Sequence, residues 1–444
     1  MKNKLMLALF LFAVNLQAQT KQLELKDAIN YALENKAEAK KAKLEVENSN
    51  YKIEEVRSQA LPQLTLNGGL NYNAILQQTA LPGELIGKPG ESVMVAFGQK
   101  WNSTASAQLT QQIFNQQVFT GLKAARSTRE FYQINQQLTE EQLIEKVATN
   151  YFQVYVTQVK LKNVESNLET TKKVFDILNG QYKSGLARKI DVDRMQVNVS
   201  NIEAAKQQLI NSIELQKNAL KFFIGMPMNE AITLPEQNIE LTDKAFVSEV
   251  KTDSRTEVAL LKKQEELLVF QKKAYQAEYY PTLSLNANYG YQGLGNEFPW
   301  FAGTDKGVFW SNFSSFGLNL RVPVFNGFAT RSKVRQADVS LKKLQADIDD
   351  TNLGLNYAFE NAKTQIQNSI ININTQKQNV KLSEDVLENT QNNYKNGLAT
   401  LTDLLDAEKA RTEAQNNYTS ALLDYKLAEI QIYKSQGELQ SLKN

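Results

Sequence analysis

The hexapeptide Tyr182-Lys183-Ser184-Gly185-Leu186-Ala187 returns 212 residues later as Tyr394-Lys395-Asn396-Gly397-Leu398-Ala399. Two shorter segments return in the same order, at offsets of 219 and 211 residues: Leu61-Pro62-Gln63-Leu64 as Tyr280-Pro281-Thr282-Leu283, and Phe114-Asn115 as Phe325-Asn326. Three recurrences in one order indicate that the chain contains the same structural unit twice. The drop in offset from 219 to 211 predicts a longer connection between the strands of the first copy.

Two long proline-free stretches, 90–226 and 324–444, predict the helical parts, because proline interrupts helices. Each stretch contains an apolar column with a seven-residue period: Val147, Val154, Leu161, Leu168, Phe175 and Tyr182, then Phe359, Ile366, Ile373, Val380, Leu387 and Tyr394. This period indicates long helices packed as in coiled coils. We expect long helices at 116–184 and 327–396, each ended by a glycine, Gly185 or Gly397. Shorter helices are expected at 24–60, 190–224, 253–279 and 402–434.

Four further segments alternate strictly between apolar and polar residues, which predicts β-strands. Their apolar positions are Leu64, Leu66, Gly68, Leu70, Tyr72, Ala74 and Leu76; Ala105, Ala107, Leu109 and Ile113; Leu283, Leu285, Ala287, Tyr289 and Tyr291; and Phe316, Leu318, Leu320, Val322 and Val324. The opposite positions carry mainly Asn, Gln, Ser and Thr. This pattern is typical of a membrane barrel with a wet lumen. A half-buried sheet of a soluble domain is the alternative.

Tryptophan placement favours the membrane interpretation. All three tryptophans, Trp101, Trp300 and Trp310, lie beside these strands, as an aromatic belt at a membrane interface requires. Four strands cannot close a barrel, because bacterial barrels have at least eight and an open edge is not tolerated in lipid. We therefore predict that the chain oligomerises, with two copies supplying eight strands or three copies supplying twelve.

Composition excludes several classes of function. The chain of 444 residues has neither cysteine nor histidine, which removes disulfides, the usual zinc sites and the common nucleophile and acid–base groups of enzymes. We expect no enzyme activity, no cofactor and no metal. The 50 basic and 48 acidic residues nearly balance, whereas nucleic-acid binders carry a basic excess.

The first 18 residues resemble a secretory signal. Lys2 and Lys4 precede an apolar run at 5–14 that is too short to span a bilayer, and we expect cleavage after Ala18. No cysteine follows the cleavage point, so no lipid anchor is expected. The predicted organisation is a signal peptide at 1–18, a first repeat of helix, two strands and long helix hairpin at 19–226, a linker or equatorial segment at 227–252, and a second repeat at 253–444.

The sequence combines a signal peptide with a duplicated helix–strand–strand–hairpin unit, LPQL/YPTL strand starts and Gly-x5-Asp tips. In this combination it resembles the outer membrane efflux protein family of the TolC type. The resemblance covers nearly the whole mature chain and implies an α+β membrane protein of Gram-negative bacteria. It implies a homotrimer whose outer-membrane β-barrel, with four strands per chain, continues into a long periplasmic α-helical coiled-coil barrel. The implied function is the passive exit duct of a tripartite efflux or type I secretion system. The implied partners are a periplasmic adaptor, an inner-membrane transporter and outer-membrane lipid.

The segment after the second tip carries the candidate gate. Asp403 and Asp406 match the family's Asp-x-x-Asp constriction, and around a trimer axis they would form two rings of carboxylates that favour cations. Two solvated acids near a helix start are the alternative interpretation, because negative charge suits that end of the dipole. Asp191 holds the matching place after the first tip.

The resemblance also assigns the tips and the latch. Tyr394 matches the family's latch tyrosine, whereas Ala399 stands where a latch arginine is expected, so that this latch is absent or built differently. The pairs Gly185-Leu186 and Gly397-Leu398 match the Gly-Leu pairs that adaptors grip; turn chemistry plus a buried leucine is the alternative.

A different class of protein also fits the long hairpins. A periplasmic coiled-coil adaptor, or a structural protein of an envelope assembly, would contain similar heptad helices. Neither class accounts for the four alternating strands or for the aromatic residues beside them. Extraction from cells distinguishes a membrane barrel from these alternatives. A barrel requires detergent, whereas an adaptor without an anchor is released by osmotic shock.

Overall fold

The computed structural model describes residues 21–82, 84, 87, 89–236, 252 and 255–443. The predicted signal peptide at 1–18 and most of the predicted linker at 227–252 lie outside these residues. The chain divides into two compact units. The helical unit comprises Met1–Val46, Phe131–Lys262 and Ala346–Asn444, and the sheet unit comprises Glu47–Glu130 and Lys263–Gln345.

The long helices form where proline is absent. Helix α4 (Gln116–Lys183) is followed by α5 (Lys189–Ile224), and α7 (Ala329–Lys395) is followed by α8 (Leu401–Gln436). The shorter helix α6 (Thr256–Ala277) precedes the third strand of the large sheet. All of these bounds agree with the predicted ranges within three residues. Among the described residues, no helix combines the length and the apolar character needed to cross a membrane.

The predicted helix at 24–60 is in fact two helices, α2 (Leu25–Asn35) and α3 (Ala37–Ser58), separated at Lys36. The backbone of Lys36 is extended there, with ψ of 134°. Its Nζ donates to the Phe222 carbonyl oxygen at 2.7 Å and lies 3.7 Å from the centroid of the Phe222 ring. A tertiary contact with the end of α5 therefore accompanies the break.

Most of each heptad column is buried or half-buried in the helical unit, although Tyr182 at the end of the first column is 41% exposed. Val147, Val154, Ile366 and Ile373 are almost inaccessible to solvent. Val147 and Val154 belong to a core that joins α2, the middle of α4 and the end of α5 to the parallel pair of β1 (Lys21–Gln22) with β6 (Ile232–Thr233). The short helix η4 (Leu439–Lys443) contributes Leu439 to the same core.

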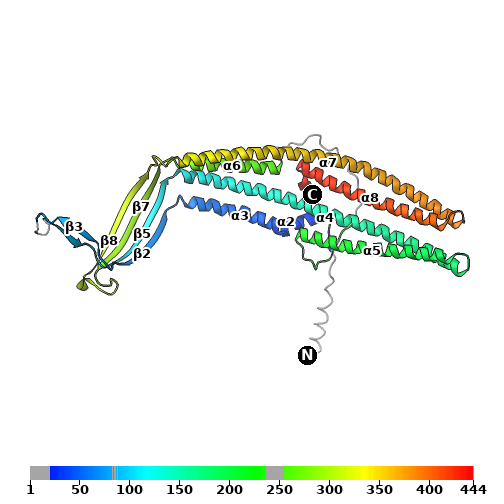
Figure 1. Ribbon diagram of the computed structural model, residues 1–444, viewed down its shortest axis with the longest axis horizontal. Coiled ribbons are helices and arrows are strands. Elements are labelled where there is room, and N and C mark those ends of the chain that lie inside the picture. Colours follow the sequence, from blue (N-terminus) through cyan, green and yellow to red (C-terminus); the bar gives the residue numbers. More distant parts are fainter. Residues whose placement is uncertain are drawn as a thin grey trace, which may run out of the picture. The chain divides into compact units, whose positions relative to one another are not determined.

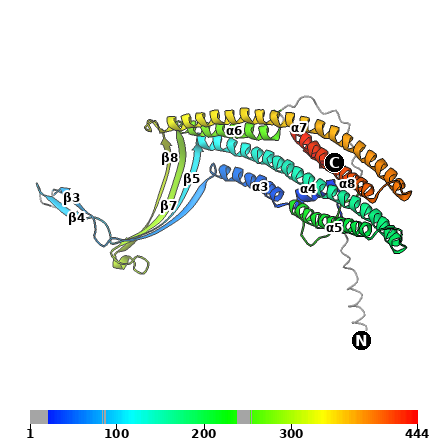
Figure 2. The same ribbon diagram turned by 45° about the vertical axis from the view of Figure 1, so that its right-hand side comes forward.

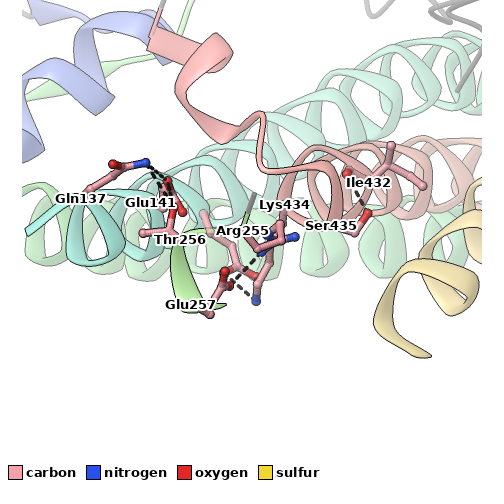
Figure 3. A network of polar contacts seen from close by, with 9 residues as sticks. Gln137, Glu141, Arg255, Thr256, Glu257, Ile432, Lys434 and Ser435 are labelled. Atoms are coloured by element: carbon pink, nitrogen blue, oxygen red, sulfur yellow. Dashed lines mark hydrogen bonds and ion pairs between the residues drawn. The ribbon is translucent and has the colours of Figure 1, made fainter. Parts of the chain in front are cut away.

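Polar contacts attach the start of α6 to α4 (Figure 3). The Thr256 hydroxyl donates to Glu141 Oε1 at 2.8 Å, and Gln137 Nε2 donates to both side chains. The neighbouring Arg255 is almost fully buried, and its guanidinium donates to Glu257 Oε1 at 2.8 Å. The contacts among Thr256, Glu141 and Gln137 satisfy polar groups that would otherwise be costly to bury. Arg255 Nε and Glu257 Oε2 are buried without a hydrogen-bond partner among the described residues.

The large sheet has four antiparallel strands in the order β2-β5-β7-β8. They are β2 (Gln63–Tyr72), β5 (Trp101–Phe114), β7 (Thr282–Gly295) and β8 (Val308–Arg321). The pair β5–β7 joins the two copies, with Ala107 opposite Tyr289. The edges of the sheet are β2 and β8.

The pairing register confirms the predicted two faces, except that Ile113 lies at an irregularity of the β5–β7 register and that β8 ends at Arg321, before the predicted Val322 and Val324. Directly opposite residues share a face, and one face gathers the predicted apolar residues: Leu64, Leu66, Leu70, Tyr72, Ala105, Ala107, Leu109, Leu283, Leu285, Ala287, Tyr289, Tyr291, Phe316, Leu318 and Leu320. Within the sheet unit, Figures 1 and 2 show the helical segments continuing from one end of the strands and not lying across the sheet. Leu66 and Phe316 are consequently 82% and 77% exposed in the single chain. Proteins in water rarely expose an apolar face of this extent, so we expect it to contact lipid or another protein surface.

The first copy contains a further hairpin that the sequence did not predict. Strands β3 (Gln78–Pro82) and β4 (Ser92–Ala96) pair antiparallel between β2 and β5. Strand β2 ends at Tyr72 and does not continue to Leu76 as predicted. Figure 1 shows the hairpin extending from the end of the sheet that lies away from the helices. It occupies the longer connection that the repeat offsets indicated.

Candidate functional site

The two hairpin tips of the helical unit have the same turn. Gly185 and Gly397 both have φ of 76°, a left-handed conformation that a side chain disfavours. The next N–H, of Leu186 or Leu398, donates at 2.8 Å to the carbonyl oxygen of Gln181 or Asn393. This is a Schellman motif, which ends a helix by satisfying its last carbonyl groups. It leaves the side chains of Leu186 and Leu398 81% and 79% exposed, contrary to the alternative of a buried leucine.

An apolar cluster beneath the turns packs the two tips against each other. Its buried members come from α4, α5, α7 and α8: Leu178, Met195, Leu387, Leu401, Leu404 and Ala407. Tyr394 and Val192 lie at the edge of this cluster. The cluster therefore fixes the starts of α5 and α8, which carry the candidate gate acids, relative to each other.

Asp403 closes a capping box at the start of α8. The backbone N–H of Thr400 donates to Asp403 Oδ2 at 2.8 Å, the Thr400 hydroxyl donates to the same oxygen at 2.7 Å, and Asp403 N donates to Thr400 Oγ1 at 3.2 Å. These bonds, the backbone one first, lower the pKa of the Asp403 carboxyl. The carboxylate is solvent-exposed and ionised at neutral pH.

Asp406 lies one turn further along α8 and lines a groove between α8 and α5. The groove has a volume of about 620 Å³, and Asp193, Arg194 and Lys409 also line it. Asp406 is exposed. Both signs of charge line the groove within a single chain, so that Asp406 is not part of a purely acidic surface there.

Tyr394 and Asp191 are brought together from different hairpins. Burial, and then the negative charge of Asp191, raise the pKa of the Tyr394 hydroxyl. Asp191 Oδ2 also lies 3.0 Å from Nε of Arg188, the residue before α5. The structure thus groups tyrosine, aspartate and arginine at the tips, with the arginine on the first tip and not at position 399.

Glu408 is a candidate functional residue that the sequence patterns did not identify. Its side chain is 4% exposed, and neither carboxyl oxygen has a hydrogen-bond partner among the described residues. Burial raises the pKa of Glu408 to about 7, and the charge of Arg411 offsets only part of that effect. Glu408 also lines the groove that contains Asp406. Leu401, Leu404 and Glu408 have helical spacing, so an acid within an apolar stripe was the signal that would have identified it.

The tryptophans of the sheet unit gather near the ends of the strands that lie away from the helices. Trp101 and Trp310 are on the apolar face of the sheet, and Trp300 Nε1 donates to Ser103 Oγ at 3.0 Å. The Trp310 ring stacks on Tyr291 with centroids 5.0 Å apart, and the Trp101 ring contacts Tyr72 at 4.7 Å. Gly293 lies opposite Trp310, whose ring occupies the space of the missing side chain.

Among the described residues, no three side chains of the metal-binding types come together. The features that remain are a pair of hairpin tips with exposed leucines, acids at the starts of the returning helices, and a sheet whose apolar face is uncovered.

The outer membrane efflux protein family matches residues 28–226 and 264–438. The chain is 24% identical over 396 residues to outer membrane protein TolC of Escherichia coli (strain K12), which covers 87% of this chain and 77% of TolC. It is 22% identical over 426 residues to the alkaline protease secretion protein AprF of Pseudomonas aeruginosa, covering 93% and 84% of the two chains.

Solved structures share the fold. The outer membrane protein VceC of Vibrio cholerae superposes with a TM-score of 0.73 at 19% identity, over 93% of this chain and 96% of VceC. The open state of the MtrE outer membrane channel of Neisseria gonorrhoeae superposes with a TM-score of 0.72 at 19% identity, over 94% and 89%.

This chain belongs to the outer membrane efflux protein family. It is an outer-membrane channel for efflux or secretion in a Gram-negative bacterium, and the family consists of channels and not of enzymes.

We expect Glu408→Gln to remove a pH-dependent loss of stability. Because burial raises the pKa of Glu408 from 4.5 to about 7, the folded protein binds more protons than the unfolded chain in this window. Stability therefore falls as the pH rises from about 4.5 to 7, by roughly 3 kcal/mol. The Gln variant should unfold at a higher temperature than the parent at pH 8 and at a similar temperature at pH 4.5, measured from the helical circular dichroism.

Glu388→Gln is the matched control, because Glu388 is an exposed acid on α7. That variant should keep the parent's dependence on pH. Equal dependence in the parent and in Glu408→Gln would show that Glu408 is not the titrating group.

Proposed function

We propose that three copies close the four-stranded sheet into a twelve-stranded outer-membrane barrel. The observation that carries this proposal is the pair of open edges, β2 and β8, on a sheet with one apolar face. Strand directions alternate from β2 to β8, so β8 of one copy would meet β2 of the next in antiparallel orientation. Each new contact would satisfy backbone groups that lipid leaves unpaired.

Three copies suit a duct better than two. An eight-stranded barrel has an interior that side chains fill, whereas larger barrels leave an aqueous lumen. The family resemblance likewise implies a trimer. In this arrangement the face with Leu66 and Phe316 contacts lipid, and the opposite face, with Asn67 and Asn286, lines the lumen. Trp101, Trp300 and Trp310 would then form the aromatic belt at one membrane interface.

The duct would continue through the periplasm as a barrel of helices and end at the hairpin tips. The two repeats, 19–226 and 253–444, would each supply one hairpin per chain, with 227–252 as the equatorial segment and 1–18 as the removed signal. The channel supplies no energy in this scheme. A periplasmic adaptor and an inner-membrane transporter would deliver the cargo, as in a tripartite efflux or type I secretion system.

At the tips, Asp403 and Asp406 would form two rings of three carboxylates around the closed aperture. The capping box supports this role, because it holds the Asp403 carboxylate in place and keeps it ionised. Clustered carboxylates repel one another and attract counter-ions. Tyr394 and Asp191 would hold the two hairpins together in the closed state, with Arg188 taking the part of the arginine that is absent at position 399.

The double substitution Asp403→Ala and Asp406→Ala tests the gate. In planar bilayers we expect a weaker preference for cations, and block by trivalent cations from the periplasmic side weakened by about tenfold or more, because such ions need several carboxylate ligands. Tyr394→Phe should instead raise the resting conductance with little change in ion selectivity, because it removes the hydroxyl that senses Asp191 of the other hairpin and removes no charge.

Glu413→Gln is the control for the charge rings. Glu413 lies on the same helix as both acids and in the same groove as Asp406, about 10 Å further along the helix than Asp406 and about 15 Å further than Asp403. It should leave selectivity and block nearly unchanged. If the double Ala variant behaved like the parent, the constriction would lie elsewhere and the two acids would be ordinary helix-start charges.

The exposed leucines of the tips are the proposed docking points for the adaptor. Leu186 and Leu398 project from equivalent turns and have no apolar cover in the single chain. We expect Leu186→Asp or Leu398→Asp to abolish efflux and cross-linking to the adaptor, while the oligomer stays intact. Ser184→Asp, an equal charge change one residue before Gly185, should have the smaller effect. Cross-linking that survives both leucine changes would refute this docking assignment.

A further inference from the structure

A positively charged groove with aromatic walls lies in the sheet unit, between the first turns of α4 and the last turns of α6. It has a volume of about 220 Å³. Helix α4 contributes Phe119 and Lys123, and α6 contributes Phe270 and Lys273; Tyr280, just after α6, completes one end. The gate, the tips and the barrel strands do not include this groove.

The geometry of the two helices explains why these side chains converge. Phe119 and Lys123 are four residues apart and therefore share a face of α4, and Phe270 and Lys273 share a face of α6. The helices run antiparallel, and Lys263 Nζ lies 2.6 Å from Glu130 Oε2 further from the sheet. Lys273 Nζ is 5.5 Å from the centroid of the Phe270 ring.

The charge of the groove is uncompensated. Lys272 pairs with Asp338 and Lys333 pairs with Glu278, each at a distance below 3 Å. In contrast, Lys123 and Lys273 are exposed and have no carboxylate partner among the described residues. No Asp or Glu lines the groove. Two lysines that line one groove without a counter-ion favour an anion, and phosphate is a usual ligand of lysine.

The groove lies next to the strands. Phe119 follows the end of β5 by five residues, and Tyr280 precedes the start of β7 by two. Exposed aromatic residues beside basic ones are typical of the level of lipid headgroups. Phe119 and Tyr280 are each about half exposed in the single chain. Basic pockets between helices at this level bind anionic headgroups.

We propose that this groove binds the headgroup of an anionic phospholipid of the inner leaflet of the outer membrane. Lys123 and Lys273 contact the phosphate, and the rings of Phe119 and Tyr280 contact the glycerol and the first methylene groups. A volume of about 220 Å³ accommodates a headgroup, and the acyl chains leave past Tyr280 toward the sheet. The proposal rests on the proposed function, because that function places the strands in the membrane.

Native mass spectrometry of the detergent-purified oligomer tests this site. The protein is titrated with phosphatidylglycerol or with phosphatidylcholine of the same chain length. We expect preferential retention of phosphatidylglycerol, one per chain. The double substitution Lys123→Gln and Lys273→Gln should weaken its binding about thirtyfold, which corresponds to about 1 kcal/mol for each lysine. Phosphatidylcholine binding should change much less.

Lys342→Gln with Lys343→Gln is the control, because it removes the same charge from an exposed stretch of α7 in the same unit. It should leave the affinity for phosphatidylglycerol unchanged. Phe119→Ser should weaken lipid binding, whereas glycerol 3-phosphate should compete poorly because it lacks acyl chains. Full competition by glycerol 3-phosphate would show a simple anion site and overturn the lipid assignment.

The same spectra separate this proposal from the proposed function. A trimer that binds both lipids equally, or that keeps its lipid preference without Lys123 and Lys273, overturns the lipid site and leaves the channel architecture intact. A monomer overturns the architecture, and the lipid site with it.

Discussion

The unpaired backbone edges of β2 and β8 are the constraint on which the account of this protein depends. A strand edge exposes a row of N–H and C=O groups, and each of them costs several kcal/mol when it enters hydrocarbon without a partner. The sheet cannot curl into a barrel alone, since it has four strands. Its apolar face nevertheless matches lipid and not water. Both demands are met together when further copies of the chain pair with the two edges.

The internal duplication supplies the strands and hairpins of such an oligomer from one repeated unit. Each copy of the repeat supplies one strand pair and one long hairpin, and β5 and β7 join the copies through a continuous ladder. The heptad columns bury one face of α4 and of α7, while the tips use the same Schellman turn. The contact between α4 and α8 is not uniformly apolar. Asn167 donates to Thr412 across it, and the buried Glu408 lies one turn nearer the tip.

Local patterns were enough to predict much of the fold and part of the site. The two-residue period assigned Leu66 and Phe316 to one face, and the register confirms it. The glycines at 185 and 397 located the turns, because their conformation is disfavoured for other residues. The hairpin β3–β4 was missed because its strands have five residues each, too short for alternation to stand out. The break at Lys36 depends on Phe222, 186 positions away, and no local pattern reports such a contact. The family resemblance assigned Tyr394 and Asp191 to the tips but did not predict that they interact, and the burial of Glu408 was not expected at all.

The most direct test of the central claim is the mass of the detergent-solubilised protein, measured by native mass spectrometry, together with its sheet content from circular dichroism. We expect a single species with three times the mass of the mature chain and an intact sheet signal. A second variant, with prolines in β8 at Leu318 and Leu320, should lose the trimer, because proline cannot donate to a strand ladder. A monodisperse monomer of the parent chain with its sheet intact would contradict the claim, because it would show that the edges of β2 and β8 need no partner.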